Sequence, residues 1–270
     1  MKPASFDYHR ASSLEEAVAL LGSSGDGATL ISGGQSLTPL LNLRLSPSDT
    51  IIDISRLAAL RDTRDLGDSV YLGAGLTHAM FEDGEAPDPA NGLMRKAAAH
   101  IAYRAVRCHG TIGGSVAMAD PAADWPAVLL ALDATAVVLG AGGERRVGMN
   151  KLLTGTYTTS LEPGEMITGF EVRKLGASAR TSYVKFNKKV GAFASSLAVA
   201  VRDGDQVRIV LAGAGPRATL LERVAQAALK DTDRLRETLE LEVAAIVEEP
   251  DPYACALHVA TLSRALGDIS

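Results

Sequence analysis

Thr111-Ile112-Gly113-Gly114-Ser115 is the stretch around which the rest of this chain is organised. Two adjacent glycines let the backbone approach a ligand closely and adopt dihedral angles that other residues resist. Main-chain N–H groups turned to one side of such a loop form a concavity that holds an anion such as a pyrophosphate. A second stretch of the same kind, Ser32-Gly33-Gly34-Gln35-Ser36, lies much earlier in the chain. Together they predict one elongated, phosphate-bearing ligand that is held from two sides.

Neither stretch matches a common phosphate-binding fingerprint. The sequence has no G-x-G-x-x-G between a strand and a helix at these places, and no G-x-x-x-x-G-K-[ST]. Gly and Ser are also ordinary turn residues, so each stretch taken alone is equally well explained as a tight turn. The recurrence of similar Gly-Gly and Ser chemistry favours the binding interpretation over two unrelated turns.

The composition is that of a globular protein with small aliphatic cores. Apolar residues make up 47% of the 270 residues and aromatic residues only 4%, and the formal net charge is −5. That charge, without a long run of one sign, predicts no nucleic-acid partner. No apolar run reaches the roughly 18–20 residues that a membrane span needs, and residues 1–30 lack a signal-peptide pattern.

The two cysteines, Cys108 and Cys255, limit the metal chemistry. Two thiols cannot supply the four thiolates of an iron–sulfur cluster, and they lack zinc-site spacing. So few cysteines fit a reducing cytoplasm, where we expect the protein to act. We expect Cys108 to be a buried, inert side chain rather than a reactive thiol.

The chain is expected to contain two domains, because its pattern changes at a Gly-containing connector around residues 175–179. Before it, short strands and helices mix; after it, three strands and then helices indicate an α+β module. The expected limits are 1–176, with sub-lobes of about 1–56 and 57–176, and 177–270. Strands are predicted at 6–9, 28–31, 50–54, 69–75, 134–139, 145–148, 166–172, 181–187, 195–201 and 207–211. Helices are predicted at 12–22, from 77, and at 93–101, 125–132, 218–228, 231–247 and 253–266, with loops at 111–115 and 152–163.

Asp124 is the leading polar candidate beside the central stretch. A carboxylate at this position is suited to accept hydrogen bonds from ligand hydroxyls. It also precedes Trp125-Pro126, where Asp is a strong helix start signal, so a capping role is equally open. Asp120, before Pro121, is more readily explained as a turn residue.

No acid–base pair or nucleophile emerges from the remaining polar residues. None of the five histidines, at positions 9, 78, 100, 109 and 258, has metal-ligand spacing with another, and no G-x-S-x-G elbow is present. Lys185, Lys188 and Lys189 either approach a ligand or form a solvated strand edge. A binding scaffold without its own catalytic set is expected where a cofactor performs the chemistry.

With these motifs in view, the chain resembles the FAD-binding medium subunits of molybdenum hydroxylases, of the aerobic carbon monoxide dehydrogenase and xanthine dehydrogenase type. The resemblance covers nearly the whole chain. It is carried by SGGQSLTPLLNLR (32–44) and RCHGTIGGSVAMADPAADWPAVLLALDA (107–134). It implies a two-part FAD-binding domain of the PCMH, vanillyl-alcohol-oxidase-like type. A C-terminal α+β domain with a three-stranded antiparallel sheet and a helical bundle would follow it.

The resemblance also implies which residues hold FAD. The two glycine stretches would hold the pyrophosphate, the residues before the second stretch would line the adenine and ribityl region, and Asp124 would bond the ribityl chain. Ile167 would make an apolar flavin contact and Lys185 would approach the isoalloxazine. Gln35 replaces the His through which some related flavoproteins attach FAD, so binding would be noncovalent. The implied contacts are Ser32, Gly33, Gly34, Gln35, Ser36, Leu37, Ile101, Ala102, Val106, Gly110, Thr111, Gly113, Gly114, Ser115, Asp124, Ile167 and Lys185.

Partners and reaction follow from the same resemblance. A large subunit would carry the molybdenum cofactor and a small subunit two [2Fe–2S] clusters, in a dimer of heterotrimers. Electrons would pass through FAD to NAD, a quinone-linked carrier or oxygen. Where the family often has Arg-Arg and then Asp, this chain has Lys188, Lys189 and Ala192. The alternatives are a stand-alone FAD oxidase of the same fold and a non-enzymatic nucleotide-binding scaffold subunit.

Overall fold

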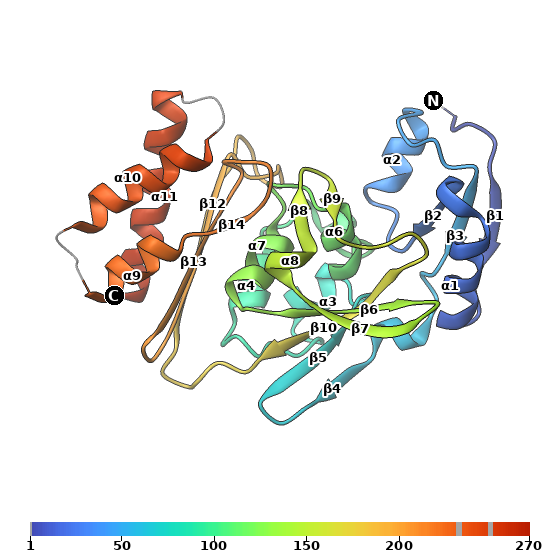
Figure 1. Cartoon of the computed structure of the whole chain (residues 1–270), viewed down its shortest axis with the longest axis horizontal. Coiled ribbons are helices and arrows are strands. Elements are labelled where there is room, and N and C mark those ends of the chain that lie inside the picture. Colours follow the sequence, from blue (N-terminus) through green and yellow to red (C-terminus); the bar gives the residue numbers. More distant parts are fainter. Residues whose placement is uncertain (1, 231–233, 248–250) are drawn as a thin grey trace.

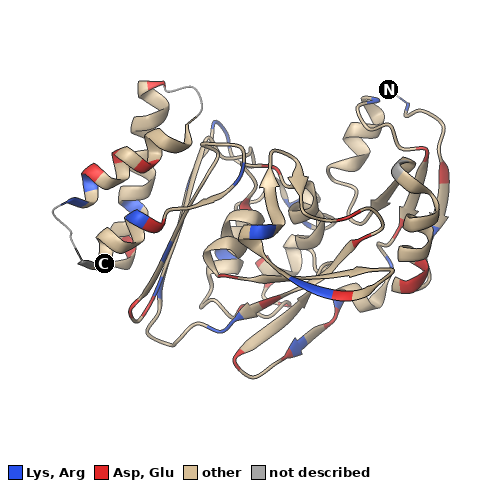
Figure 2. Cartoon of the chain, in the orientation of Figure 1, with Lys and Arg blue, Asp and Glu red and all other residues tan. Residues whose placement is uncertain are grey.

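Three larger β-sheets of the described chain follow one another across the molecule, from the N-terminal end to the C-terminal helices (Figure 1), and a two-stranded ribbon accompanies them. The computed structural model describes residues 2–230, 234–247 and 251–270. Parallel and antiparallel sheets are combined with helices, which confirms the α+β class. Acidic and basic residues are interspersed along these elements (Figure 2), in keeping with the small net charge.

The N-terminal sheet is parallel, with the strand order β1-β3-β2. Its first helix begins after Ser13, whose hydroxyl accepts a hydrogen bond from the Glu16 amide at 3.1 Å. Ile51 and Ile52 on the middle strand are buried. The carboxyl end of β2 leads directly into the first glycine stretch. The elements are β1 (Asp7–Arg10), α1 (Leu14–Ser23), η1 (Gly25–Gly27), β2 (Ala28–Ile31), α2 (Leu37–Asn42) and β3 (Thr50–Asp53).

The central sheet has five strands in the order β4-β5-β10-β6-β7, and all neighbours are antiparallel. Its middle strand β10 buries Ile167, Phe170 and Val172. The strands are β4 (Thr63–Asp65), β5 (Ser69–Gly73), β6 (Thr135–Gly140), β7 (Gly143–Gly148) and β10 (Met166–Arg173). The other elements here are η2 (Ala58–Arg61), α3 (His78–Asp83), α4 (Leu93–Ala99), α5 (Arg104–Arg107), α6 (Ile112–Met118), α7 (Asp124–Ala131), α8 (Met149–Leu152), β8 (Leu153–Gly155) and β9 (Thr158–Thr159).

The C-terminal sheet is antiparallel, with the order β11-β12-β13-β14, and both of its faces are covered. Leu197 and Val199 on β12 pack with the core that contains α7, whereas Ala198 and Ala200 pack with the C-terminal helices. This alternation follows from the two-residue period of a strand. The elements are β11 (Arg180–Phe186), β12 (Ser196–Asp203), β13 (Gln206–Ala212), β14 (Thr219–Leu220), α9 (Glu222–Lys230), α10 (Leu235–Ile246) and α11 (Pro252–Ile269).

Helix α7 joins the central and C-terminal parts. All eight of its residues are buried, and it contacts both β12 and β13. At its end, Arg208 of β13 donates to the carbonyl oxygens of Leu130 and Ala131 at 2.9 and 3.2 Å and pairs with Asp133 at 3.0 Å. The C-terminal sheet is therefore fixed to the central part of the chain by an apolar helix and a half-buried guanidinium.

Three sequence expectations about the fold are wrong. The predicted loop 111–115 is the start of α6, because the Thr111 hydroxyl accepts from the Gly114 amide at 3.1 Å and caps the helix. The C-terminal sheet has four described strands rather than three, because Thr219 and Leu220 pair with β13, so α9 begins only at Glu222. The predicted loop 152–163 contains the two-stranded ribbon β8–β9.

Strand β4 was not expected from the sequence, and all three of its residues are exposed, so no hydrophobic pattern marks it. The helix expected from residue 231 begins, among described residues, at Leu235, while residues 231–233 lie outside the part that the structure describes. The sheets fall on either side of residues 56 and 176, and the domain limits themselves stay a proposal.

Candidate flavin site

The loop after β2 is an open main-chain loop. Within the described chain, the amides of residues 33–37 donate to no protein group. Gly34 has φ of +70°, a conformation that favours glycine, and the Gln35 side chain folds back to donate to the Gly33 carbonyl at 3.2 Å. Several adjacent, unengaged N–H donors form the kind of concavity that binds phosphate oxygens.

The second glycine pair has a different local structure. Gly113 is buried, its amide donates to the Ala74 carbonyl at 2.9 Å, and a Cβ there would lie 2.5 Å from the Ala74 side chain. Gly114 is exposed, and among described residues a Cβ there would meet only the Thr111 hydroxyl, at 2.9 Å. Gly113 is thus needed for close packing, and Gly114 presents an open face. Ser115 is half-buried in the same helical turn.

The two stretches meet in space. The Ser32 and Thr111 hydroxyls are hydrogen-bonded at 3.2 Å. A Cβ on Gly33 would lie 2.0 Å from the His109 carbonyl oxygen and 2.9 Å from the Gly110 Cα. The main chains therefore touch, and only glycine at position 33 permits this approach. The juxtaposition that the sequence suggested is present, and it brings the loop amides beside the exposed face of Gly114.

A buried histidine supports the second stretch from behind. His78 Nδ1 accepts a hydrogen bond from Trp125 Nε1 at 2.9 Å, and Gly110 leaves room for the imidazole, because a Cβ there would lie 2.6 Å from His78 Nε2. Burial, and secondarily the Arg107 charge, lowers the pKa of His78 to about 4. His78 is therefore neutral at physiological pH and has a packing role. Sequence reasoning did not single it out, because its partners are distant in sequence.

The turn that follows α4 forms a wall next to these stretches. Ile101 and Ala102 are half-buried, and Ala102 has φ of +44°. Arg107 Nη1 donates to the carbonyl oxygens of Ile101 and Ala102 at 2.9 and 3.1 Å. Val106, in the short α5, accepts the Gly110 amide at 2.8 Å. The wall and the second glycine stretch are therefore parts of one continuous hydrogen-bonded segment.

Asp124 does not cap α7. Its carboxylate pairs with Lys185 Nζ at 2.9 Å and accepts a hydrogen bond from the Tyr183 hydroxyl. Both charged side chains are less than 5% exposed. Burial raises the pKa of Asp124, while the Lys185 ammonium and the Tyr183 hydroxyl oppose that rise. Tyr183 and Lys185 are two residues apart on β11 and so share a face, which the sequence pattern could have predicted, although it does not identify Asp124 as their common partner.

The pair is connected to the wall. Lys185 Nζ also donates to the His100 carbonyl at 3.2 Å, one residue before Ile101. Ile167 is buried at a bulge in β10, and the adjacent Thr168 carbonyl accepts the Ala74 amide at 2.9 Å. Hydrogen bonds and packing therefore connect the predicted residues into one region, with Asp124 and Ile167 at its buried end and Gln35 and Ser36 at its exposed end.

Other candidates have simpler roles. Asp120 accepts the Ala122 amide at 2.8 Å, as expected of a turn residue. Cys108 was expected to be buried and is exposed, because it follows a single helical turn at the surface. Lys188 and Lys189 are exposed in the loop after β11, and no described acid pairs with them. Among described residues there is no metal-ligand cluster, and no helix has the length and apolar character needed to cross a bilayer.

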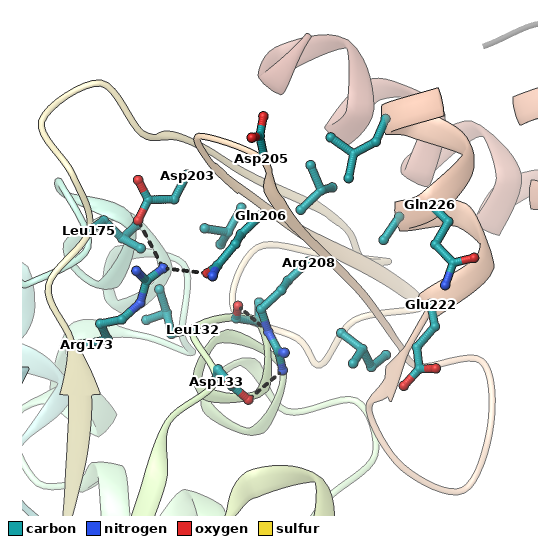
Figure 3. Close-up of a pocket in the computed structure, with 16 residues that line it drawn as sticks. Leu132, Asp133, Arg173, Leu175, Asp203, Asp205, Gln206, Arg208, Glu222 and Gln226 are labelled. Atoms are coloured by element: carbon teal, nitrogen blue, oxygen red, sulfur yellow. Dashed lines mark hydrogen bonds and ion pairs between the residues drawn. The ribbon is translucent and has the colours of Figure 1, made fainter. Parts of the chain in front are cut away.

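The hydrogen-bond donors of the two glycine stretches suit an anionic dinucleotide better than the residues that line the separate cavity near the C-terminal sheet do. A cavity of about 450 Å³ lies between β13, α9 and the end of α7 (Figure 3). Two arginines in it are already bound, Arg173 to Asp203 and Arg208 to Asp133, both at 3.0 Å. The glycine stretches instead offer unengaged amides and hydroxyls beside an apolar wall, which suits a pyrophosphate with an attached ring system.

Comparison with known proteins gives the family. The family model described as the FAD binding domain in molybdopterin dehydrogenase matches residues 4–173. The alpha subunit of the 6-hydroxypseudooxynicotine dehydrogenase complex of Paenarthrobacter nicotinovorans is 38% identical, over 81% of this chain and 76% of its own length. The carbon monoxide dehydrogenase medium chain of Hydrogenophaga pseudoflava is 35% identical, over 81% and 78%.

Solved structures agree. Carbon monoxide dehydrogenase from Hydrogenophaga pseudoflava, in a form that lacks the Mo-pyranopterin moiety of its molybdenum cofactor, matches with a TM-score of 0.93 and 32% identity, over 100% of this chain and 98% of that one. Quinoline 2-oxidoreductase from Pseudomonas putida 86 matches with a TM-score of 0.85 and 27% identity, over the full length of both chains. The resemblance inferred from the glycine stretches is confirmed: the chain belongs to the family of FAD-binding subunits of molybdenum hydroxylases, and it is an oxidoreductase subunit.

Proposed function

We propose that this chain binds FAD noncovalently where the β2 loop meets α6, and that it works as the electron-transfer subunit of a three-subunit molybdenum hydroxylase. The observation that carries the proposal is the contact between the two glycine stretches, through Ser32, Gly33 and Thr111. When bound, FAD would accept two electrons and pass them to an external acceptor. This chain's residues bind it, orient it and exclude water.

The proposed contacts divide by chemistry. The open amides of residues 33–37, together with Ser32, Thr111 and the exposed face of Gly114, bind the pyrophosphate. Ile101, Ala102, Val106 and Gly110 line the adenine and ribityl region. Gln35 has no nucleophilic ring nitrogen and already bonds the Gly33 carbonyl, which supports noncovalent binding.

Asp124 and Lys185 are proposed to face the ribityl chain and the ring system as a unit. Each neutralises the other's buried charge, so neither brings net charge to the cofactor. Removing one partner would leave an uncompensated buried charge. Ile167, at the β10 bulge, supplies an apolar surface.

The partners are proposed from the family. The relatives are named as medium chains or subunits of complexes, which supports a large molybdenum subunit and a small [2Fe–2S] subunit, assembled as a dimer of heterotrimers in the cytoplasm. The acceptor would be NAD, a quinone-linked carrier or oxygen. The relatives' names include substrates as different as carbon monoxide, nicotine and caffeine, so substrate choice is proposed to rest with the molybdenum subunit.

The test is to purify the full chain, reconstitute it with FAD and record its visible absorbance. We expect a flavin spectrum, no iron and no oxidation of organic substrates. Colourless protein after reconstitution would reject FAD binding, and turnover of an organic substrate by the chain alone would favour a stand-alone oxidase. Reduction of the flavin by substrate only when the partner subunits are present would support the electron-transfer role.

A glycine variant locates the site. Gly114→Val places a branched side chain on the open face, where only the Thr111 hydroxyl is near. The added Cβ would lie 2.9 Å from the Thr111 hydroxyl that caps α6, so that side chain must shift. We expect FAD affinity to fall at least about tenfold, or about 1.4 kcal/mol, and circular dichroism checks that the variant is folded. Gly142→Val is the matched control, because nothing lies within 4 Å of a Cβ there. Equal FAD affinity in the Gly114→Val variant and wild type would place the site elsewhere.

A further inference from the structure

The turn His100–Ala102 has a feature that its role as a wall does not by itself require. Three consecutive carbonyl oxygens each accept a hydrogen bond from a cationic side chain that is at most 12% exposed. Lys185 takes the His100 carbonyl at 3.2 Å, and Arg107 takes those of Ile101 and Ala102 at 2.9 and 3.1 Å. Two cations from different elements, Lys185 on β11 and Arg107 on α5, therefore fix one short turn.

Arg107 is itself held rigidly. Its Nε and Nη2 donate to the two carboxylate oxygens of Glu82 at 2.7 and 2.8 Å, which leaves Nη1 directed at the turn. The Arg107 side chain is only 12% exposed. The Arg107 guanidinium lowers the pKa of Glu82, so the carboxylate stays charged. A bidentate Arg–carboxylate pair fixes geometry as well as charge, which lysine cannot reproduce.

The turn needs external support. Ala102 has φ of +44°, in the left-handed region that alanine disfavours. On its other side Gly191 packs so closely that a Cβ there would lie 2.9 Å from the Ala102 carbonyl group. Strained backbone of this kind persists where its surroundings over-determine it, and such places cluster at ligand sites.

We propose that Arg107, held by Glu82, is a positioning residue of the flavin site. It keeps the Ile101–Ala102 turn in the shape that receives the adenine and ribityl part of FAD, without touching FAD itself. Arg107 is three residues before Gly110 in the sequence, and the Gly110 amide donates to the Val106 carbonyl at 2.8 Å, so the residue that holds the turn belongs to the segment that leads into the second glycine stretch. The inference rests on the proposed function, in which Ile101 and Ala102 line the cofactor.

Arg104 provides a matched control. It lies on the same one-turn helix and pairs with Glu82 and Asp83 at 2.6 and 2.5 Å. Among described residues it bonds neither carbonyl of the turn. Loss of Arg104 removes a comparable charge and a comparable ion pair, so an effect specific to the turn will appear only when Arg107 or Glu82 is changed.

The experiment measures the FAD dissociation constant of the full chain by flavin fluorescence, at a temperature where circular dichroism shows every variant folded. We expect Arg107→Met to weaken FAD binding at least about tenfold, equivalent to about 1.4 kcal/mol. Arg107→Lys should recover part of the loss, because an ammonium still reaches one carbonyl. Glu82→Gln should lose about threefold, and Arg104→Met should stay within about twofold of wild type.

Each outcome of this experiment supports or overturns the positioning role of Arg107. Wild-type affinity in the Arg107→Lys and Glu82→Gln variants would overturn the inference, and these two decide it if Arg107→Met does not fold. A loss in Arg104→Met as large as that in Arg107→Met would also overturn it, because it would show general destabilisation. Failure of wild type to bind FAD would instead reject the proposed function, so the two failures are distinguishable.

Discussion

The loop after β2 and the first turn of α6 both combine Gly-Gly with Ser or Thr, and they differ in what their amides do. In the loop, the amides of residues 33–37 have no acceptor among described residues. In α6, Thr111 caps the Gly114 amide and the Gly113 amide bonds Ala74. One stretch supplies donors, and the other supplies close packing and one open glycine.

The difference shows that a glycine pair can be required for separate reasons at its two positions. Gly33 and Gly113 are needed because neighbouring groups lie where a Cβ would be. Gly34 is needed for its φ of +70°, and Gly114 leaves an open face. Substitutions at these positions should therefore give different losses of stability and of FAD affinity.

The largest effect is expected at Gly33. In Gly33→Ala the added Cβ would overlap the His109 carbonyl oxygen at 2.0 Å, and main chain cannot rotate away as a side chain can. The two stretches must separate, so we expect FAD affinity to fall at least about 1,000-fold, or about 4 kcal/mol. FAD titration measures it, and Gly22→Ala in the same lobe, with nothing within 4 Å, is the control. Retained affinity would show that the contact between the stretches is dispensable.

Acid should lower the free energy of unfolding through His78, the buried histidine behind the second glycine stretch. Its folded pKa is about 4, against an ordinary value of 6.5, so above pH 6.5 both states are neutral and stability is flat. Between pH 6.5 and about 4 the unfolded chain binds a proton that the folded chain does not, which costs roughly 3 kcal/mol in total. Urea denaturation from pH 8 to 4 measures it. His78→Asn, which keeps an acceptor for Trp125, should remove that part of the slope, and identical pH profiles would contradict the assignment.

Much of the structure of the two glycine stretches could be predicted from the sequence. The parts that could not be predicted depend on contacts between residues that are distant in the sequence. The glycine stretches, the residues beside them and the strand ahead of the first loop follow from local pattern. That Thr111 caps a helix was missed, because Gly113 and Gly114 are poor helix formers and tertiary packing against Ala74 decides the matter. The Asp124–Lys185 pair was missed as a pair, because its members lie on α7 and β11, 61 residues apart in the sequence, and meet only in the fold.

Gly113→Ala should affect stability more than binding. Its Cβ would lie 2.5 Å from the Ala74 side chain and 2.8 Å from the Ala74 carbonyl oxygen, so α6 must shift from β5. We expect a loss of about 2 kcal/mol in the free energy of unfolding, typical of overpacking, measured by urea denaturation. Gly267→Ala, also in a helix but with nothing within 4 Å, should instead be neutral or stabilising by up to about 1 kcal/mol. Equal behaviour of the two would refute close packing as the reason for Gly113.

The smallest effect separates the two roles of Thr111. The Thr111 hydroxyl caps α6 and also bonds Ser32, whereas the Ser32 hydroxyl bonds Thr111 alone among the described residues. Ser32→Ala should therefore lower the free energy of unfolding by about 0.5–1 kcal/mol, the net value of one hydrogen bond. Thr111→Val should lower the free energy of unfolding by about 1 kcal/mol more than Ser32→Ala does, because the helix cap is lost as well. Thr111→Ser should stay near wild type. If Ser32→Ala is as damaging as Thr111→Val in urea denaturation, the cap contributes nothing, and the second stretch depends on the first for its structure.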